Sequence, residues 1–295
     1  MRYFQIAVLL VVISPFPDNW LAAAEPARPN ILLAISDDQT WRHAGAYGDT
    51  VVSTPAFDRV AREGVLFNYG FCSTPSCSPS RAAILTGQDF WRLKSGANLF
   101  GALPNNHLVY PRLLEAAGYY VGHTGKARAW NQQLSGRAKH PAGDAWNQKR
   151  LKSAPAAGIS RIDYAGNFQA FLESRPKEKP FCFWYGSIEP HRFYEPGSGV
   201  RSGKKLKDVI VPAFFPDVPQ VRGDILDYYV EIEWFDRHLA RIIEMLEERG
   251  ELNNTIIVVT SDHGMPFPRA KTNLYDYGVR VPLAIRWPEK VAGKR

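Results

Sequence analysis

The feature that most constrains the fold is a regular alternation of short apolar runs with longer amphipathic segments. Runs typical of buried strands lie at residues 30–36, 65–71, 119–124, 180–187 and 255–261. Segments with helical character lie between them, at residues 54–64, 78–85, 110–118, 164–175 and 223–249. This alternation predicts an α/β fold in which a mostly parallel sheet is sandwiched by helices.

Helix boundaries and loops can also be read from residue types. Thr54, Pro55 and Gly64 are expected as N-cap, first helical residue and C-cap of one helix. Two polar segments, 131–160 and 192–222, interrupt the alternation. Both are expected to be long surface loops, which in compact domains are often functional.

The N-terminus has the layout of a secretory signal peptide. Arg2 precedes an apolar run over residues 6–13, and small residues at 22–24 precede Glu25. We therefore expect a signal peptide over 1–24, a catalytic domain over 25–295, and a secreted or periplasmic protein. A retained lipid or membrane anchor is the alternative for this segment. No stable membrane insertion is expected, because the apolar run is too short to span a bilayer.

Charge and cysteine content leave several readings open. The formal net charge is +7, which favours anionic partners such as sulfated or phosphorylated substrates, nucleic acid or membrane surfaces, and which a merely basic surface explains equally well. The odd number of cysteines leaves at least one free thiol in an exported chain. Cys72 and Cys182 either pair or are separately buried.

Acidic residues follow two of the predicted strands. Asp37 and Asp38 come directly after the strand at 30–36, and Asp262 and His263 come directly after the strand at 255–261. Ligands of open α/β sheets gather beyond the carboxyl ends of the strands. Three carboxylates and an imidazole brought together there need a counter-charge, so the sequence favours a divalent metal site over separate strand caps.

Cys77 lies at the start of a predicted helix, with Pro79 in its first turn and Arg81 four residues on. A helix N-terminus stabilises negative charge, and an arginine can pair with an anion. A structural thiol is the alternative for Cys77. The arrangement nevertheless predicts an anion site beside this cysteine.

These residues match a known family. The segment "CSPSRAAILTG" contains Cys-x-Pro-x-Arg and, with Asp37-Asp38 and "SDHG", resembles the type I (formylglycine-dependent) sulfatases of the alkaline phosphatase superfamily. The segments "EPHRFYEPG", "VPAFFPDVPQVRGDILDYY" and "SDHGMPFPRAKTNLY" are similar to N-sulfoglucosamine sulfohydrolase (sulfamidase)-like members. The resemblance runs from about residue 28 to about residue 288 and implies an alkaline-phosphatase-like fold.

The resemblance implies a modified nucleophile and a metal. In the family a formylglycine-generating enzyme oxidises the motif cysteine, so Cys77 is expected to be the precursor of formylglycine. One divalent metal, in the family calcium, is expected to be bound by the formylglycine and by Asp37, Asp38, Asp262 and His263. The family usually has Asn at the position of His263, and imidazole suits transition metals better than calcium, so the identity of the metal stays open.

The resemblance also implies roles for four further residues. Arg81 is expected to hold the formylglycine and neutralise charge, and Lys126 is expected to contact the sulfate. His191 and Lys271 are expected at the bridging atom of the substrate, where they protonate or polarise the leaving group. Arg128 stands where the family has a histidine, which leaves the base that deprotonates the aldehyde hydrate unassigned.

The implied function is hydrolysis of sulfate esters or sulfamates of sulfated carbohydrates. One hydroxyl of the aldehyde hydrate attacks sulfur and expels the alcohol or amine, and the other then releases sulfate. Family members continue past residue 295 into a smaller C-terminal subdomain, so we expect the chain to be truncated. The alternatives are a phosphonate or phosphodiester hydrolase of the same superfamily and an inactive glycan-binding chain. No nucleic-acid partner is expected, and the oligomeric state is left open.

Overall fold

The computed structural model describes residues 28–127, 136–288 and 290–291. The signal peptide predicted for residues 1–24 and the unusual Arg128 lie outside these described residues. Within the described part of the chain, no helix is long and apolar enough to cross a membrane.

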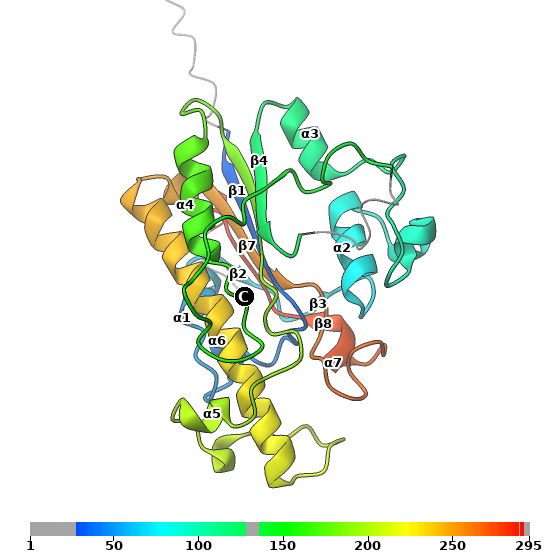
Figure 1. Ribbon diagram of the computed structural model, residues 1–295, viewed down its shortest axis with the longest axis vertical. Coiled ribbons are helices and arrows are strands. Elements are labelled where there is room, and N and C mark those ends of the chain that lie inside the picture. The colour runs from blue at the N-terminus through cyan, green and yellow to red at the C-terminus, as the bar shows by residue number, and fades with distance from the viewer. Residues whose placement is uncertain (1–27, 128–135, 289, 292–295) are drawn as a thin grey trace, which may run out of the picture.

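A seven-stranded sheet forms the centre of the molecule, with the strand order β2-β9-β7-β1-β6-β4-β5 (Figure 1). Its strands are β1 (Asn30–Ser36), β2 (Val65–Leu66), β4 (Tyr120–Gly125), β5 (Asp144–Ala145), β6 (Phe181–Gly186), β7 (Thr255–Ser261) and β9 (Leu283–Arg286). The five strands from β7 to β5 in this order run parallel, whereas β9 pairs antiparallel with β7 and with β2. The expected mostly parallel sheet is therefore confirmed.

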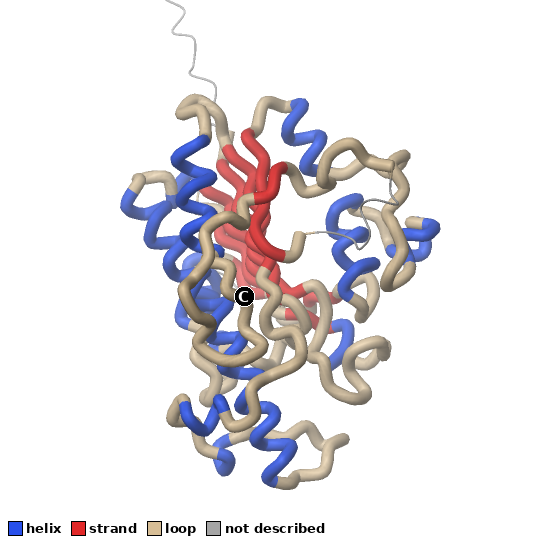
Figure 2. Tube along the Cα trace, viewed as in Figure 1, coloured by secondary structure: helices blue, strands red, loops and turns tan. Residues whose placement is uncertain are grey.

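Helices cover both faces of this sheet. The α-helices of the described residues are α1 (Pro55–Glu63), α2 (Cys77–Thr86), α3 (Tyr110–Ala116), α4 (Tyr164–Ser174), α5 (Ser198–Arg201), α6 (Pro219–Glu248) and α7 (Asp276–Val279). The helices α1, α4 and α6 lie on one face, and α2 and α3 lie on the other, as the blue and red segments of Figure 2 show.

Two apolar clusters fill the spaces between these layers. On one face, Leu32 of β1 and Phe183 of β6 belong to a cluster with Phe168 of α4 and with residues of α1 and α6. On the other face, Ile35 and Trp184 belong to a cluster with residues of α2. Successive side chains of a strand point to opposite faces, so β1 and β6 each supply both clusters.

The segment 65–71, expected as one strand, is two. Its first part is β2, at the edge of the main sheet, and its last part is β3 (Gly70–Phe71), which pairs with β8 (Arg280–Val281) in a separate two-stranded sheet. The prediction was wrong because apolar side chains here do not mark burial. Phe67 and Tyr69 are 39% and 75% exposed.

Helix α1 is capped differently from the expectation. Thr54 is the N-cap residue and Pro55 the first helical residue, as predicted, but the Thr54 side chain makes no capping hydrogen bond. Asp236 of α6 instead accepts hydrogen bonds from the backbone N–H groups of Ala56 and Phe57, at 2.9 and 2.8 Å. A carboxylate is favourable at this position because free N–H groups point out of the helix there.

Candidate active site

The two acidic strand ends are side by side because β1 and β7 are parallel neighbours in register. Ser36 pairs with Ser261, so Asp37 and Asp262 follow at the same edge of the sheet. One ligand atom from each of Asp37, Asp38, Asp262 and His263 lies within 4.8 Å of the others, and all four residues are buried. The structure thus brings together the four residues of the predicted metal site.

The backbone is shaped to make this cluster compact. The Asp38 backbone has φ of 75°, a left-handed conformation that aspartate adopts more readily than most residues. Its N–H donates to Oδ1 of Asp262 at 3.0 Å, and the N–H of His263 donates to the same oxygen at 2.9 Å. These bonds fix the Asp262 carboxylate against both strand ends.

The cluster is electrostatically coupled. Burial alone would raise the pKa of Asp38, but the His263 imidazole, 2.8 Å away between Nε2 and Oδ1, and the Lys271 ammonium together hold this pKa below its usual value. Burial would likewise lower the pKa of His263, but the carboxylates of Asp262 and Asp38 raise it well above the usual value. Positive charge is therefore needed where these carboxylates meet.

Several atoms of the cluster fit a metal ion as the missing partner. Among the described residues, Oδ1 of Asp37 is buried without a hydrogen-bond partner, and the equally buried Oδ1 of Asp38 and Nε2 of His263 form the 2.8 Å ion pair described above. Buried polar atoms normally have a hydrogen-bond partner, and unpaired buried carboxylate oxygens are costly. Converging carboxylate oxygens and one imidazole nitrogen are a suitable donor set for a divalent cation.

Cys77 is the first residue of α2, one position earlier than expected, and Ser76 is the N-cap. The Cys77 side chain lies beside the acidic cluster. Burial would raise the pKa of its thiol, but a hydrogen bond with His263 and the charge of Lys126 lower it. The helix N-terminus and these two cations make this position suited to negative charge.

Arg81 lies one turn further along α2 and is fully buried. Its Nε donates to Oδ2 of Asp262 at 2.9 Å, its Nη2 lies 3.7 Å from Oδ1 of Asp37, and its Nη1 donates to the carbonyl oxygen of Lys126. Arg81 therefore joins α2, both acidic strand ends and the end of β4, and it neutralises part of their negative charge.

A pocket of about 670 Å³ opens beside Cys77, and we call it the Cys77 pocket. Lys126, His191 and Lys271 line it together with Cys77. Lys126 forms an ion pair with Asp37, and Nζ of Lys271 lies 2.7 Å from Oδ2 of Asp38. The structure thus brings every residue of the predicted site, including both lysines, to one pocket and the cluster behind it.

His191 lies at the edge of this arrangement, with its side chain 37% exposed and its Nε2 4.0 Å from Oδ2 of Asp38. Its Nδ1 is 2.7 Å from the carbonyl oxygen of Arg192. Because a carbonyl only accepts, Nδ1 carries a proton, and Nε2 is the nitrogen that faces the carboxylate. A proton on Nε2 would make the ring a cation that can donate to a leaving group.

The sequence reasoning missed Glu189, which holds the segment carrying His191. Its buried carboxylate accepts hydrogen bonds from the backbone N–H of Ser160 at 2.6 Å and from the Tyr164 hydroxyl at 2.8 Å. Its carbonyl oxygen accepts from the N–H of Asp37 at 2.9 Å. Glu189 stands two residues before His191 in the quoted "EPHRFYEPG", but a glutamate beside a proline in a loop carries no sequence signal of burial.

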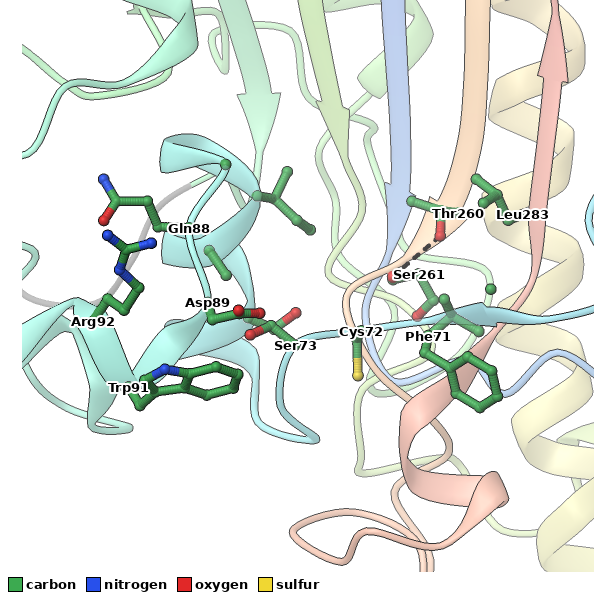
Figure 3. Close-up of a pocket in the computed structure, with 16 residues that line it drawn as sticks. Phe71, Cys72, Ser73, Gln88, Asp89, Trp91, Arg92, Thr260, Ser261 and Leu283 are labelled. Carbon is green, nitrogen blue, oxygen red and sulfur yellow. Dashed lines mark hydrogen bonds between the residues drawn. The ribbon is translucent and has the colours of Figure 1, made fainter.

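A second pocket, of about 680 Å³, lies against another side of α2 (Figure 3). Trp91 and Arg92 lie on one side of it and Phe71, Cys72 and Leu283 on the other. None of the predicted site residues lines it.

The structure also decides between the two alternatives for the cysteines. Cys72, Cys77 and Cys182 are all free, so the possible disulfide between Cys72 and Cys182 is not formed.

Comparison with known proteins identifies the family. The family model described as "Sulfatase" matches residues 29–295. The chain belongs to the sulfatase family. This sulfatase-family chain is 30% identical to human N-sulphoglucosamine sulphohydrolase over 291 residues, which cover 89% of the chain and 56% of that protein. It is 29% identical to an ulvan-active sulfatase of Formosa agariphila, over 90% of the chain and 48% of that protein.

The fold is alkaline-phosphatase-like. The phosphonate monoester hydrolase of Agrobacterium radiobacter superposes with a TM-score of 0.68 at 20% identity, over 89% of this chain and 68% of that one. The family match over residues 29–295 and the curated relatives confirm the resemblance to sulfatases expected from the motifs. The chain spans about half the length of the curated relatives it matches.

Proposed function

We propose that residues 25–295 form a catalytic domain that hydrolyses sulfate esters or sulfamates of sulfated carbohydrates, after oxidation of Cys77 to formylglycine. The observation that carries the proposal is the convergence of Cys77, Lys126, His191 and Lys271 on one pocket, directly against the buried cluster of Asp37, Asp38, Asp262 and His263. The named activities of the relatives, on N-sulfoglucosamine and on ulvan, support a sulfated carbohydrate as substrate.

We assign each residue a role from its position in the site. Lys126 and Lys271 bring positive charge to the pocket, where they would bind the sulfate oxygens. Arg81 has no exposed surface, so we assign it to neutralising the carboxylates and holding the N-terminal turn of α2. His191, with Nε2 turned toward Asp38, would donate the proton that the departing oxygen or nitrogen needs.

The proposed reaction needs a divalent cation and the oxidation of Cys77 by another enzyme. A divalent cation, calcium by family resemblance, would be held by Asp37, Asp38, Asp262 and His263, together with the formylglycine. When bound, the cation supplies charge stabilisation and activates the hydrated aldehyde as the nucleophile. The modification requires a formylglycine-generating enzyme, and the predicted signal peptide implies export to the periplasm or the exterior.

Phosphonate or phosphodiester hydrolysis is the second candidate. His263 occupies a position where sulfatases usually have asparagine, and it contributes an imidazole to the cluster. Phosphonate hydrolases of the superfamily carry a histidine there, and the fold is similar to one of them. The pocket cations would suit a phosphoryl group as well as a sulfuryl group.

The test is a substrate panel with protein coexpressed with a formylglycine-generating enzyme and supplied with calcium. The panel contains N-sulfoglucosamine, glucosamine 6-sulfate, an aryl sulfate and an aryl phosphodiester. We expect sulfate release that Cys77→Ala abolishes. A large preference for the phosphodiester would favour the second candidate, whereas binding of sulfated glycan without any turnover by converted protein would leave only a glycan-binding role.

A further inference from the structure

The segment that carries His191 has no regular secondary structure. Residues 187–197 lie between β6 and α5 and belong to neither a helix nor a strand. The hydrogen-bond ladder of a helix or strand therefore does not fix the position of His191. Glu189 anchors the chain on one side of it, through the bonds described above. On the other side, the contacts of Arg192 hold the chain.

The Arg192 guanidinium group binds two other parts of the molecule. Nη1 and Nη2 donate to the two carboxylate oxygens of Asp224 on α6, and the bond from Nη1 measures 3.0 Å. Nε donates to the carbonyl oxygen of Pro266 at 3.2 Å, in the loop between β7 and α7. The planar, forked guanidinium group can direct its N–H groups to both partners at once, whereas a lysine ammonium cannot.

Two aromatic rings hold the same guanidinium group. Its central carbon lies 4.9 Å from the centroid of the Tyr194 ring and 4.7 Å from the centroid of the Phe267 ring, and both rings belong to buried residues. The Tyr194 hydroxyl also donates to the carbonyl oxygen of Pro190 at 2.8 Å. An ion pair whose side chains are 38% exposed would by itself contribute little. Contacts with both rings add cation–π attraction and restrict the Arg192 side chain to one arrangement.

These contacts reach the candidate active site through the backbone. The carbonyl oxygen of Arg192 accepts the hydrogen bond from Nδ1 of His191, at 2.7 Å, and so orients the imidazole ring. The loop that contains Pro266 also carries Lys271. Nε2 of His191 and Nζ of Lys271 face the same atom, Oδ2 of Asp38, at 4.0 and 2.7 Å. Arg192 therefore links the segment of the proposed proton donor to the loop of a proposed sulfate ligand.

We propose that Arg192 is a positioning residue for the reaction. Its contacts with Asp224, Tyr194 and Phe267 fix the backbone carbonyl that orients the His191 imidazole. This inference rests on the proposed function, because it takes His191 as the group that protonates the departing oxygen or nitrogen. Loss of these contacts would leave the proton donor in the chain but would let its ring turn away from the leaving group.

NMR of the histidine side chains tests the orientation without turnover. The sample is the full chain with isotope-labelled histidine, supplied with calcium and with Cys77 left unconverted. The spectrum of His191→Gln identifies the signals of His191 among the seven histidines. In the wild type we expect the neutral His191 ring to carry its proton on Nδ1. In Arg192→Ala and in Asp224→Asn we expect the tautomer with the proton on Nε2 to be populated as well.

Kinetics of the converted protein test the consequence for the reaction. A misplacement of about 1 Å can cost roughly 10²-fold in rate, so we expect Arg192→Ala to lower kcat on alkyl sulfates and sulfamates by about 10- to 100-fold, with KM nearly unchanged. The reduction should be far smaller on a nitrophenyl sulfate, whose leaving group needs little protonation. Arg192→Lys keeps the charge without the fork, so its kcat should lie between those of the wild type and Arg192→Ala.

A double variant assigns this effect to His191. When His191→Ala has already removed the proton donor, Arg192→Ala should reduce kcat much less than it does in the wild type. Arg222→Ala is the matched control, because Arg222 of α6 also forms a bidentate ion pair, with Asp217, and its Nη2 lies 2.7 Å from Oδ2. We expect this control to leave the His191 tautomer and kcat unchanged. Thermal midpoints confirm that each variant is folded.

Two results would overturn the inference. One is a His191 tautomer that stays unchanged in both Arg192→Ala and Asp224→Asn. The other is an equal reduction of kcat by Arg192→Ala in the presence and in the absence of the His191 side chain. Absence of sulfate release by the converted wild type would instead contradict the proposed function, and the tautomer comparison would still decide whether Arg192 orients His191.

Discussion

Arg81 and Asp262 form an ion pair, 2.9 Å between Nε and Oδ2, in which both side chains are fully buried. The pair connects the helix that begins with Cys77 to the end of β7. Removing one partner of a buried ion pair leaves an uncompensated charge and typically costs about 3–5 kcal/mol. We expect Arg81→Ala to lower the free energy of unfolding by that amount in urea denaturation.

Arg81→Lys separates charge from geometry in the same experiment. Lysine keeps the positive charge but lacks the planar group that reaches Asp262 and the Lys126 carbonyl together. Arg81→Lys should therefore lower the free energy of unfolding less than Arg81→Ala does. Equal stability of Arg81→Ala and wild type would contradict the structural role assigned to this pair.

Metal removal should destabilise the folded chain. The carboxylates of Asp37, Asp38 and Asp262 meet within 4.8 Å, so a bound cation relieves their repulsion. A ligand at 100 times its dissociation constant stabilises the folded state by about 2.7 kcal/mol, so chelation should lower the thermal midpoint by several degrees. Calcium should restore it in the wild type but not in Asp38→Asn. An unchanged thermal midpoint after chelation would argue against the metal site. Comparing the midpoints restored by calcium and by manganese tests how His263 influences the choice of metal.

His191 should matter most for substrates with poor leaving groups. A proton donor at the bridging atom typically contributes a factor of about 10²–10⁴, and little of it is needed when the leaving group is already a good one. We expect His191→Ala to reduce kcat on alkyl sulfates and sulfamates by about that factor and far less on a nitrophenyl sulfate. Lys179→Ala, in the turn before β6, is the control. Equal reductions of kcat by His191→Ala on all these substrates would contradict a proton-donor role.

Glu231 gives a prediction for pH dependence. Burial and the neighbouring Glu189 raise the pKa of Glu231 to about 9, and neither carboxylate oxygen has a hydrogen-bond partner among the described residues. The unfolded chain titrates this group near its ordinary pKa of about 4.3. The folded state therefore binds the extra proton between these values, and this group makes the protein less stable as pH rises from about 4 to 9.

Replacing Glu231 with glutamine should remove that pH-dependent penalty. The variant should match the wild type near pH 4 and exceed it by a few kcal/mol near pH 9. Thermal midpoints at pH 5, 7 and 9 measure the difference, with the exposed Glu178→Gln as control. A difference that does not change with pH would show that Glu231 is ionised in the folded protein.

The parts of the site that the sequence predicted are those marked by strand ends and by motif. Asp37 and Asp262 could be placed together because carboxyl ends of parallel strands meet at one edge, and the register of β1 with β7 confirms it. Cys77 and Arg81 were found because a helix start, a proline and an arginine form a recognisable pattern. The lysines and His191 were placed by family resemblance, since isolated loop residues carry no periodic signal.

Other features depend on tertiary contacts that no local pattern reports. Asp236 caps α1 from a helix about 180 residues away, and Glu189 is satisfied by donors from two other segments. The broken strand at 65–71 was missed because exposed aromatic residues there imitate a buried run.

The proposed role of Cys77 is tested most directly by a mass spectrum of the tryptic peptide Glu63–Arg81 after coexpression with a formylglycine-generating enzyme. This peptide contains Cys72 and Cys77 and no internal lysine or arginine. We expect the mass change of thiol to aldehyde, mapped to Cys77 by fragmentation. An unmodified Cys77, in cells that convert a control sulfatase, would contradict it.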